Sequence, residues 1–396
     1  MNLILISFIL YLIFMLAVGI YTSRMNKNLK DFLLGGQKLG PWVISLSERA
    51  SGESAWLLIG LTGTALLLGY AAIWTALGCV LGIIFYWIFV AKKLREKTGE
   101  YNSLTIPDYF ESRFKDTSHI IRIVSTFIIV IFYTLYIAAQ FLGAGKVLDT
   151  TFGIPHIYGM IIGAVIIVLY TILGGFFAVA WTDFFQAIIM LFALVALPII
   201  GLIKVGGFLA TTNIIQQVDP NLLNFLQGKT GWEAFALVIS GLAWGLGYMG
   251  QPHLLTRFMA IDDSKNIGKG RIIAITWAIL AYSGALLLGV VGVAALRDTV
   301  ANLPGTIFGE TLVGKEHLLP VCAKAFLSGG IWPLLAGIMI SGAIAAMMST
   351  ADSQLLVTTS ALTEDIFRKI LYKKGIKNNW QWIKKFFFNK DGTPNS

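Results

Sequence analysis

Charged and hydroxyl-bearing side chains stand inside segments that are otherwise apolar. Glu48, Arg49 and Glu53 fall in one such segment, and Ser349 and Thr350 fall in another. A charge at the centre of a bilayer costs at least ~2.5–3.5 kcal/mol by insertion scales, so it is usually paired or functional. Hydroxyls beside bare backbone carbonyls supply oxygen ligands, which suit a hard cation. These residues therefore indicate ion chemistry at membrane depth.

The composition places these residues in a membrane protein. Of 396 residues, 56% are hydrophobic and only 13% are charged, whereas an average soluble domain is about 25% charged. This excludes a soluble enzyme, a disordered chain and a fibrous repeat. The two cysteines, Cys79 and Cys322, have neither a disulfide pattern nor a metal-ligand spacing. Function must therefore be sought in the few polar groups within the bilayer.

The elements that position these groups are predicted to be membrane-spanning helices. Apolar runs of about 20 residues match the length that an α-helix needs to cross an apolar core of ~30 Å. We expect an all-α, multi-pass protein with nine spans, at about 2–23, 41–66, 70–91, 120–147, 156–175, 180–204, 232–251, 272–296 and 331–360.

The basic residues predict an orientation. Of the 30 Lys and Arg residues, 23 lie in the segments 24–40, 92–122, 252–271 and 363–396. All four segments fall on one side if nine spans are threaded, and cytoplasmic segments carry the excess of Lys and Arg. The N-terminus is then outside and the C-terminus cytoplasmic. We expect a transmembrane domain over 1–362 and a basic, aromatic tail over 363–396.

The second predicted span contains a poor continuous helix. Ala50, Ser51 and Gly52 form a run of small residues beside the charges, and we expect the chain to unwind there. An unwound turn bares carbonyls, which survive in a bilayer only when protein or a bound ion satisfies them. The alternative is a cytoplasmic helix end, with Glu48 and Arg49 in solvent.

The seventh predicted span is interrupted as well. It carries several glycines and ends at Pro252. Trp244 and Tyr248 share one helix face with Gly241 and Gly245, which favours a small cavity with aromatic walls. Close helix packing through small residues is the alternative. Interruptions five spans apart are typical of transporters built from inverted repeats.

Two interpretations are open for each of Ser349, Thr350 and Asp183. Ser349 and Thr350 could bind an ion, or their hydroxyls could bond back to carbonyls one turn earlier. Asp183, at a span entrance, could bind an ion or cap its helix. Ser353 shares the helix face of Ser349 and could contribute to a second ion site.

Four motifs, taken in order, resemble the solute:sodium symporter family. The resemblance runs from the first span to about residue 370 and implies a LeuT-type inverted-repeat fold with an extra N-terminal helix. Family members normally continue for several more spans, so we expect the second repeat to be incomplete. The motifs are Ser-Ala-Trp-Leu-Leu-Ile-Gly at 54–60, Leu-Gly-Gly-Phe-Phe-Ala-Val-Ala-Trp-Thr-Asp at 173–183, Trp-Gly-Leu-Gly-Tyr-Met-Gly-Gln-Pro-His at 244–253, and the segment 348–365.

The resemblance implies a main sodium site between two helices. Its ligands would be the carbonyls of Ala50, Glu53 and Ala346 and the hydroxyls of Ser349 and Thr350. Asp183 is also implied in sodium binding. This chain departs from the family's proline transporters, which have the order Ser-Asp-Met-Ser in the first break, because residues 51–54 read Ser-Gly-Glu-Ser.

The resemblance also implies a substrate pocket and an activity. The activity is sodium-coupled uptake of a small amino acid through the cell membrane by alternating access, with L-proline favoured. Another small organic solute, or a remnant that does not transport, are the alternatives. The pocket would be lined by Ser54, Ala55, Trp56, Tyr136, Trp244, Tyr248 and Pro252, with Gln140 one turn beyond Tyr136.

The expected partners are sodium, the substrate and the lipid bilayer, with no nucleic acid. The sequence has no His-Glu-x-x-His motif, nucleophile elbow or phosphate loop, and its histidines are scattered. We therefore expect no catalytic residue, no transition metal and no enzymatic activity.

Overall fold

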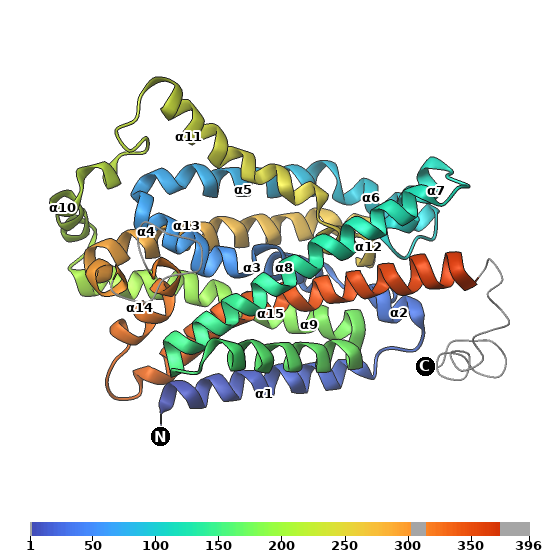
Figure 1. The fold of residues 1–396 in the computed structure, drawn as a ribbon, viewed down its shortest axis with the longest axis horizontal. Helices are drawn as coiled ribbons and strands as arrows, with labels where there is room; N and C mark the ends of the chain where they lie inside the picture. The colour runs from blue at the N-terminus through green and yellow to red at the C-terminus, as the bar shows by residue number, and fades with distance from the viewer. Residues whose placement is uncertain (1, 302–313, 373–396) are drawn as a thin grey trace.

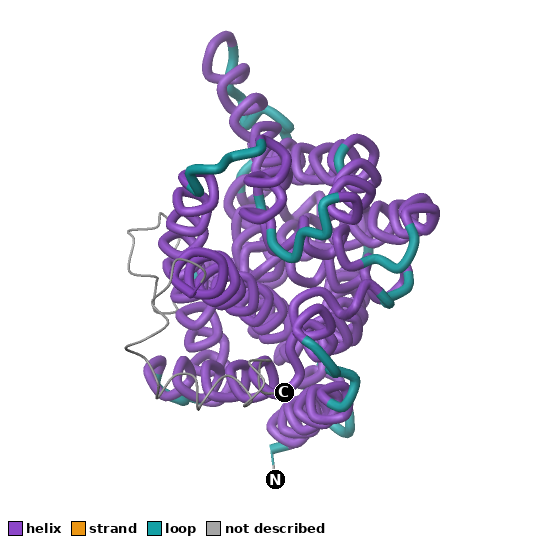
Figure 2. Tube along the Cα trace, turned by 90° about the vertical axis from the view of Figure 1, so that its right-hand side faces the viewer, coloured by secondary structure: helices purple, strands orange, loops and turns teal. Residues whose placement is uncertain are grey.

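A computed structural model of the chain describes residues 2–301 and 314–372 (Figure 1). Apart from one bridge between Leu39 and Ile261, the regular structure in these residues is helical (Figure 2). The α-helices are α1 (Leu3–Ser23), α2 (Leu29–Leu34), α3 (Pro41–Ala55), α4 (Thr62–Leu68), α5 (Ile73–Phe89), α6 (Ala91–Glu100), α7 (Ile106–Phe114), α8 (Ile120–Phe152), α9 (His156–Val205), α10 (Phe208–Val218), α11 (Gly231–Ala243), α12 (Pro252–Ala260), α13 (Ile267–Ala301), α14 (Leu318–Phe326) and α15 (Trp332–Ser360).

Short 3₁₀ and π-helical segments complete the described chain. Two of them connect consecutive α-helices. The π-helical segment η2 (Trp56–Leu61) joins α3 to α4, and the 3₁₀ segment η5 (Trp244–Gly250) joins α11 to α12. A π-helical segment, η8 (Ala361–Tyr372), continues α15. The helix therefore runs through residue 362, where we expected the tail to begin, and residues 373–396 of that tail lie outside the described residues.

Seven helical stretches of the described chain are long and apolar enough to cross a membrane. Two of them, Pro41–Phe89 and His156–Val205, are 49 and 50 residues long. A straight helix of that length would extend about 75 Å, far more than the ~30 Å apolar core. Gly69 and Gly175, with φ of 57° and 49°, turn the chain within them. Each of these stretches therefore contains two of the nine predicted spans.

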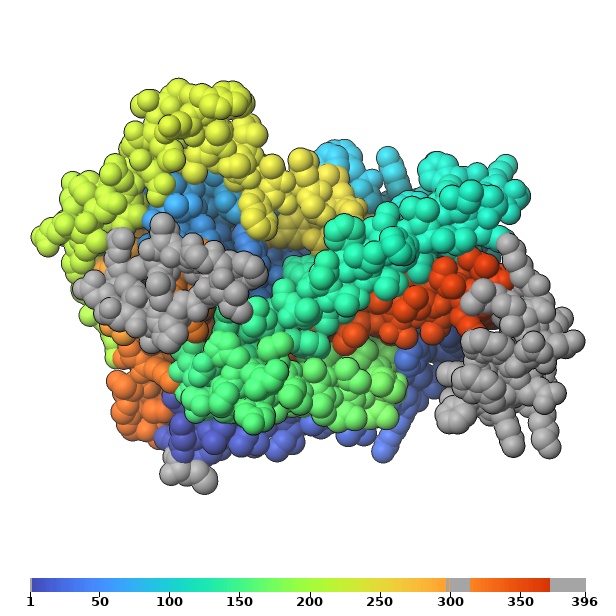
Figure 3. Space-filling model, viewed as in Figure 1, coloured from blue at the N-terminus to red at the C-terminus, as the bar shows by residue number. Residues whose placement is uncertain are grey.

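Helix α15 lies at the centre of the bundle. Within its most apolar window 83% of the residues are buried, compared with 28% for α1 and for α8. It packs against α1, α3, α8 and α9, and its glycines allow the close approach: a Cβ at Gly337 would meet Ser7 Oγ of α1 at 1.9 Å. Helix α8 instead crosses the outside of the molecule diagonally (Figure 3), with Phe127, Phe132 and Leu135 exposed.

The connections rich in Lys and Arg meet at one end of the bundle, on the right in Figure 1, where α2, α6, α7 and η8 lie. Arg122 of α8 is buried there. Its guanidinium forms ion pairs with Asp108 at 2.6 Å, with Asp365 at 2.6 Å and with Glu111. This arginine therefore joins α7, α8 and η8.

Glycines place η5 directly against α5. A Cβ at Gly245 would lie 2.1 Å from the carbonyl oxygen of Gly78 and 3.1 Å from the Cα of Gly82. The alternative of close packing through small residues is thus correct for Gly245 and also for Gly241, where a Cβ would lie 2.7 Å from the Cβ of Trp74. Close packing and the helix interruption are therefore both present in this span.

We expect Gly245→Ala to destabilise the protein by about 1–3 kcal/mol, the usual cost of overpacking, because the η5 and α5 backbones would have to separate. Thermal unfolding in detergent measures this as a lower Tm. Gly247→Ala is the matched control, since a Cβ there meets nothing within 4 Å. An equal Tm for the two variants would contradict the packing argument.

Candidate functional site

The first interrupted helix breaks at Ser54, whose φ of 54° and ψ of −171° are not helical. The predicted unwinding at Ala50–Gly52 is wrong in position, because these residues remain helical. The reason lies in α8: the Ala55 amide donates to Gln140 Oε1 at 2.9 Å. That amide would otherwise bond back to the carbonyl of Ser51. Gln140, a predicted pocket residue, thus caps the second half of the helix.

The carbonyls just before the break face two hydroxyls of α15. Ser349 Oγ lies 3.0 Å from the Ala50 carbonyl oxygen, and Thr350 Oγ1 lies 2.9 Å from that of Ser51. Both hydroxyls also bond back to the Ala346 carbonyl, at 3.2 and 3.0 Å. The interpretation that these hydroxyls bond back to a carbonyl one turn earlier is therefore confirmed, and ion binding by them stays a prediction. Four of the five predicted ligands of the main ion site come together, with Ser51 beside them.

The fifth predicted ligand, Glu53, has other partners. Its carbonyl accepts the Trp56 amide, and its carboxylate pairs with Arg49 at 2.7 Å. A role in ion binding stays a prediction for Glu53. Glu48 and Arg49 are fully buried, so the interpretation that they lie in solvent at a helix end is wrong.

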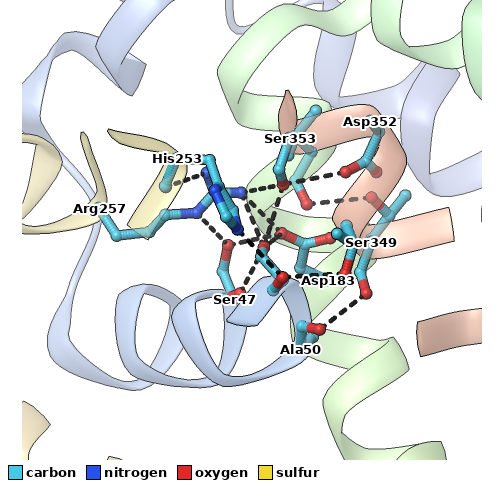
Figure 4. A network of polar contacts seen from close by, with 12 residues as sticks. Ser47, Ala50, Asp183, His253, Arg257, Ser349, Asp352 and Ser353 are labelled. Carbon is cyan, nitrogen blue, oxygen red and sulfur yellow. Dashed lines mark hydrogen bonds and ion pairs between the residues drawn. The ribbon is translucent and has the colours of Figure 1, made fainter. Parts of the chain in front are cut away.

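Asp183 lies within α9, completely buried, and does not cap a helix. Its Oδ2 accepts from Ser47 at 2.8 Å, from Ser51 at 2.9 Å and from Arg257 at 3.0 Å (Figure 4). Its Oδ1 has no hydrogen-bond partner among the residues that the structure describes. A buried carboxylate oxygen without a partner is costly and is suited to a cation.

Arg257 of α12 reaches into this group of residues, and sequence reasoning missed it. Its Nη2 contacts Ser353 Oγ, and its Nη1 donates to the His253 carbonyl at 2.7 Å. Ser353 in turn donates to Asp352 at 3.0 Å. The available signal was the spacing of His253 and Arg257, four residues apart in an apolar helix.

The second interruption faces the first. Helix α11 ends at Ala243, η5 follows, and an extended Gln251 leads into α12, which begins at Pro252. The Trp244 ring stacks on Trp56 at 4.6 Å between centroids. Across the break, Tyr136 donates to Ser54 Oγ at 3.0 Å. These contacts bring together six of the predicted pocket residues, namely Ser54, Ala55, Trp56, Tyr136, Gln140 and Trp244.

Tyr248 and Tyr282 adjoin this aromatic pair. The Tyr248 and Tyr282 hydroxyls are 2.6 Å apart, and the Tyr282 ring lies 6.3 Å from that of Trp56. Tyr282 was not predicted as a site residue. It lies in α13, whose sequence shows neither an interruption nor a buried charge near it.

Comparison with known proteins shows the family to which the chain is similar. A family model described as the sodium:solute symporter family matches residues 32–387. The sodium/proline symporter of Escherichia coli K12 is 40% identical over 381 residues, which cover 96% of this chain and 73% of that protein. The osmoregulated proline transporter OpuE of Bacillus subtilis is 38% identical over 372 residues, covering 94% and 72%.

A solved structure supports the fold. A sodium-coupled sialic acid symporter in a substrate-bound, outward-open state aligns with a TM-score of 0.78 and 20% identity, covering 93% of this chain and 75% of that one. The expected all-α, LeuT-type fold is confirmed.

Proposed function

This chain belongs to the sodium:solute symporter family, and on that basis we propose that it imports L-proline together with sodium across the cell membrane. The observation that carries the proposal is the meeting of the Ala50 and Ser51 carbonyls with the hydroxyls of Ser349 and Thr350. The names of the relatives supply the choice of proline.

Sodium is proposed to bind where these oxygens meet. Carbonyls and hydroxyls are hard ligands without a fixed charge, and a buried site strengthens their attraction for a cation. A bound ion would join α15 to α3 just before the break at Ser54. Sodium would thereby favour the outward-open state and raise the affinity for substrate, and alternating access would follow around this fixed site.

A second cation site is proposed at Asp183 and Ser353. The free Oδ1 of Asp183 supports it. Arg257 already places one positive charge there, so a second sodium would have to share these oxygens with the guanidinium or displace it.

The substrate is proposed to lie between the two interruptions. Ser54, Ala55, Trp56, Tyr136 and Gln140 would line one side, and Trp244, Tyr248 and Pro252 the other. The half-helix that begins after Ser54 directs its N-terminus, which favours a carboxylate, toward this place. Aromatic walls suit an apolar ring and an ammonium group.

The orientation is proposed from the positive-inside rule, with the N-terminus outside and the C-terminus cytoplasmic. The gathering of the basic connections at one end of the bundle supports it.

Uptake into proteoliposomes tests the proposed function. With a tenfold inward sodium gradient and 100 mV, interior negative, one sodium supplies about 3.7 kcal/mol, enough for a few hundred-fold accumulation at one sodium per substrate. We expect labelled proline to accumulate only when sodium is driven inward. Equal uptake with potassium in place of sodium would contradict symport, and no competition by excess unlabelled proline would contradict the substrate.

A further inference from the structure

A buried chain of charges lies in α3 beside the proposed ion site. Arg49 pairs with Glu48 through Nε at 2.7 Å and with Glu53 through Nη1 at 2.7 Å. All three side chains are completely buried. Buried charges are retained only with close partners, so this chain of charges has a defined role in the fold or in binding.

The two carboxylates have different surroundings. Glu48 faces α5, where it accepts from Trp87 Nε1 at 3.0 Å and from the Tyr86 hydroxyl. The Glu53 carboxyl group instead lies 2.5 Å from the Tyr282 hydroxyl and 3.2 Å from the Tyr248 hydroxyl. Because these two hydroxyls are also 2.6 Å apart, one phenol donates to the other, and the second phenol donates to Glu53. Only the second carboxylate therefore reaches the tyrosines beside the aromatic pair.

The cluster has one more acidic group than basic groups. Two carboxylates surround one guanidinium, and the ion pairs of the described residues give the cluster no second cation. An uncompensated charge in a low-dielectric interior is unfavourable, and a cation bound beside it is correspondingly stabilised. The end of the cluster at Glu53 is the one that adjoins the proposed pocket, since Tyr282 lies against Trp56.

We propose that Glu53, together with Tyr248 and Tyr282, forms the subsite for the ammonium group of the transported amino acid. This inference rests on the proposed function and specifies how its substrate is recognised. A phenol oxygen has two lone pairs, so each of the two hydroxyls keeps at least one with which to accept an N–H group. The ammonium would therefore be held by a carboxylate and by oxygens polarised by it.

The spacing along α3 fits a zwitterion. Glu53 precedes the break at Ser54, and the half-helix that follows the break has an N-terminus that favours a carboxylate. Its first amide, that of Ala55, already donates to Gln140, so the attraction comes from the helix dipole and not from that amide. An α-amino acid has one carbon between its ammonium and carboxylate groups. The break thus places a group that attracts the ammonium of an amino acid next to one that attracts its carboxylate.

Glu53→Gln tests this subsite. It removes the charge but keeps the size of the side chain, and we expect the KM for proline to rise about 10- to 100-fold, as for a lost hydrogen bond to a charged group. Competition against labelled proline then compares unlabelled proline with tetrahydrofuran-2-carboxylate, which has a ring oxygen in place of the ammonium. The inhibition constant of tetrahydrofuran-2-carboxylate divided by that of proline measures the preference for the ammonium group. We expect this ratio to fall at least about tenfold in the variant.

Glu48→Gln is the matched control. It removes an acidic group from the same cluster, but Glu48 bonds to Tyr86 and Trp87 and not to Tyr248 or Tyr282. We expect the ratio of inhibition constants to stay within about threefold of the wild-type ratio, given the larger separation from the pocket. A ratio that falls equally in both variants would overturn the subsite in favour of a general effect of cluster charge.

Tyr282→Phe provides a second variant that preserves packing if Glu53→Gln does not fold. It should also lower the ratio, and an unchanged ratio in a folded, sodium-dependent Tyr282→Phe or Glu53→Gln protein would overturn the inference. No proline uptake by the wild-type protein would instead overturn the proposed function, so the two failures are distinguishable.

Discussion

Sodium-dependent uptake is expected to collapse when Ser349 and Thr350 are both replaced by alanine. Each hydroxyl lies about 3 Å from a carbonyl of α3 that precedes the break, and in the proposed site both would also bind sodium. Losing two such ligands, each worth about tenfold or more, should raise the sodium concentration for half-maximal uptake at least ~100-fold. Proline uptake measured against sodium concentration in proteoliposomes gives this value.

Ser341→Ala is the control for that experiment. Ser341 is buried in the same helix, but its hydroxyl bonds to the Gly337 carbonyl of its own helix at 2.8 Å. We expect its sodium dependence to equal that of the wild-type protein. A double variant of Ser349 and Thr350 with unchanged sodium dependence would remove both residues from the ion site.

Asp183→Asn is expected to abolish transport and to destabilise the protein. The change leaves the Arg257 guanidinium without the carboxylate that lies 3.0 Å from it. Removing one partner of a buried pair usually costs about 3–5 kcal/mol, because the remaining charge is uncompensated. Thermal unfolding in detergent and proline uptake measure the two effects separately.

The double variant Asp183→Asn with Arg257→Gln separates structure from ion binding. It removes both charges, so we expect most of the lost thermal stability to return. Transport should stay absent if Asp183 binds a cation, as proposed. Recovery of sodium-dependent uptake together with stability would show that Asp183 acts only as the partner of Arg257.

The fold was predictable because apolar runs and basic connections report span number directly. Gly69 and Gly175 turn the long helical stretches where the sequence predicts separate spans. The meeting of Ser349 with the first interrupted helix was also predictable, from the motifs and from the need to satisfy bare carbonyls. These features depend on local composition or on a recognisable pattern.

The exact position of the first break was not predictable from local sequence. Small residues indicated Ala50–Gly52, whereas the chain breaks at Ser54 because Gln140, on another helix, takes the Ala55 amide. Arg257 and Tyr282 were missed for the same reason. Each acquires its role from side chains that are distant in sequence, and tertiary contacts override local preference.

The three carboxylates that converge on Arg122 have a consequence for the rate of the transport cycle. Charge-assisted hydrogen bonds are strong and directional, and those of Arg122 join α7 and α8 to Asp365 in the first half of η8. At the end of the bundle where the basic connections meet, the helix ends can separate only when these bonds are released together and water replaces them. The opening of this end of the bundle should therefore be a two-state step whose rate depends on the release of the Arg122 guanidinium.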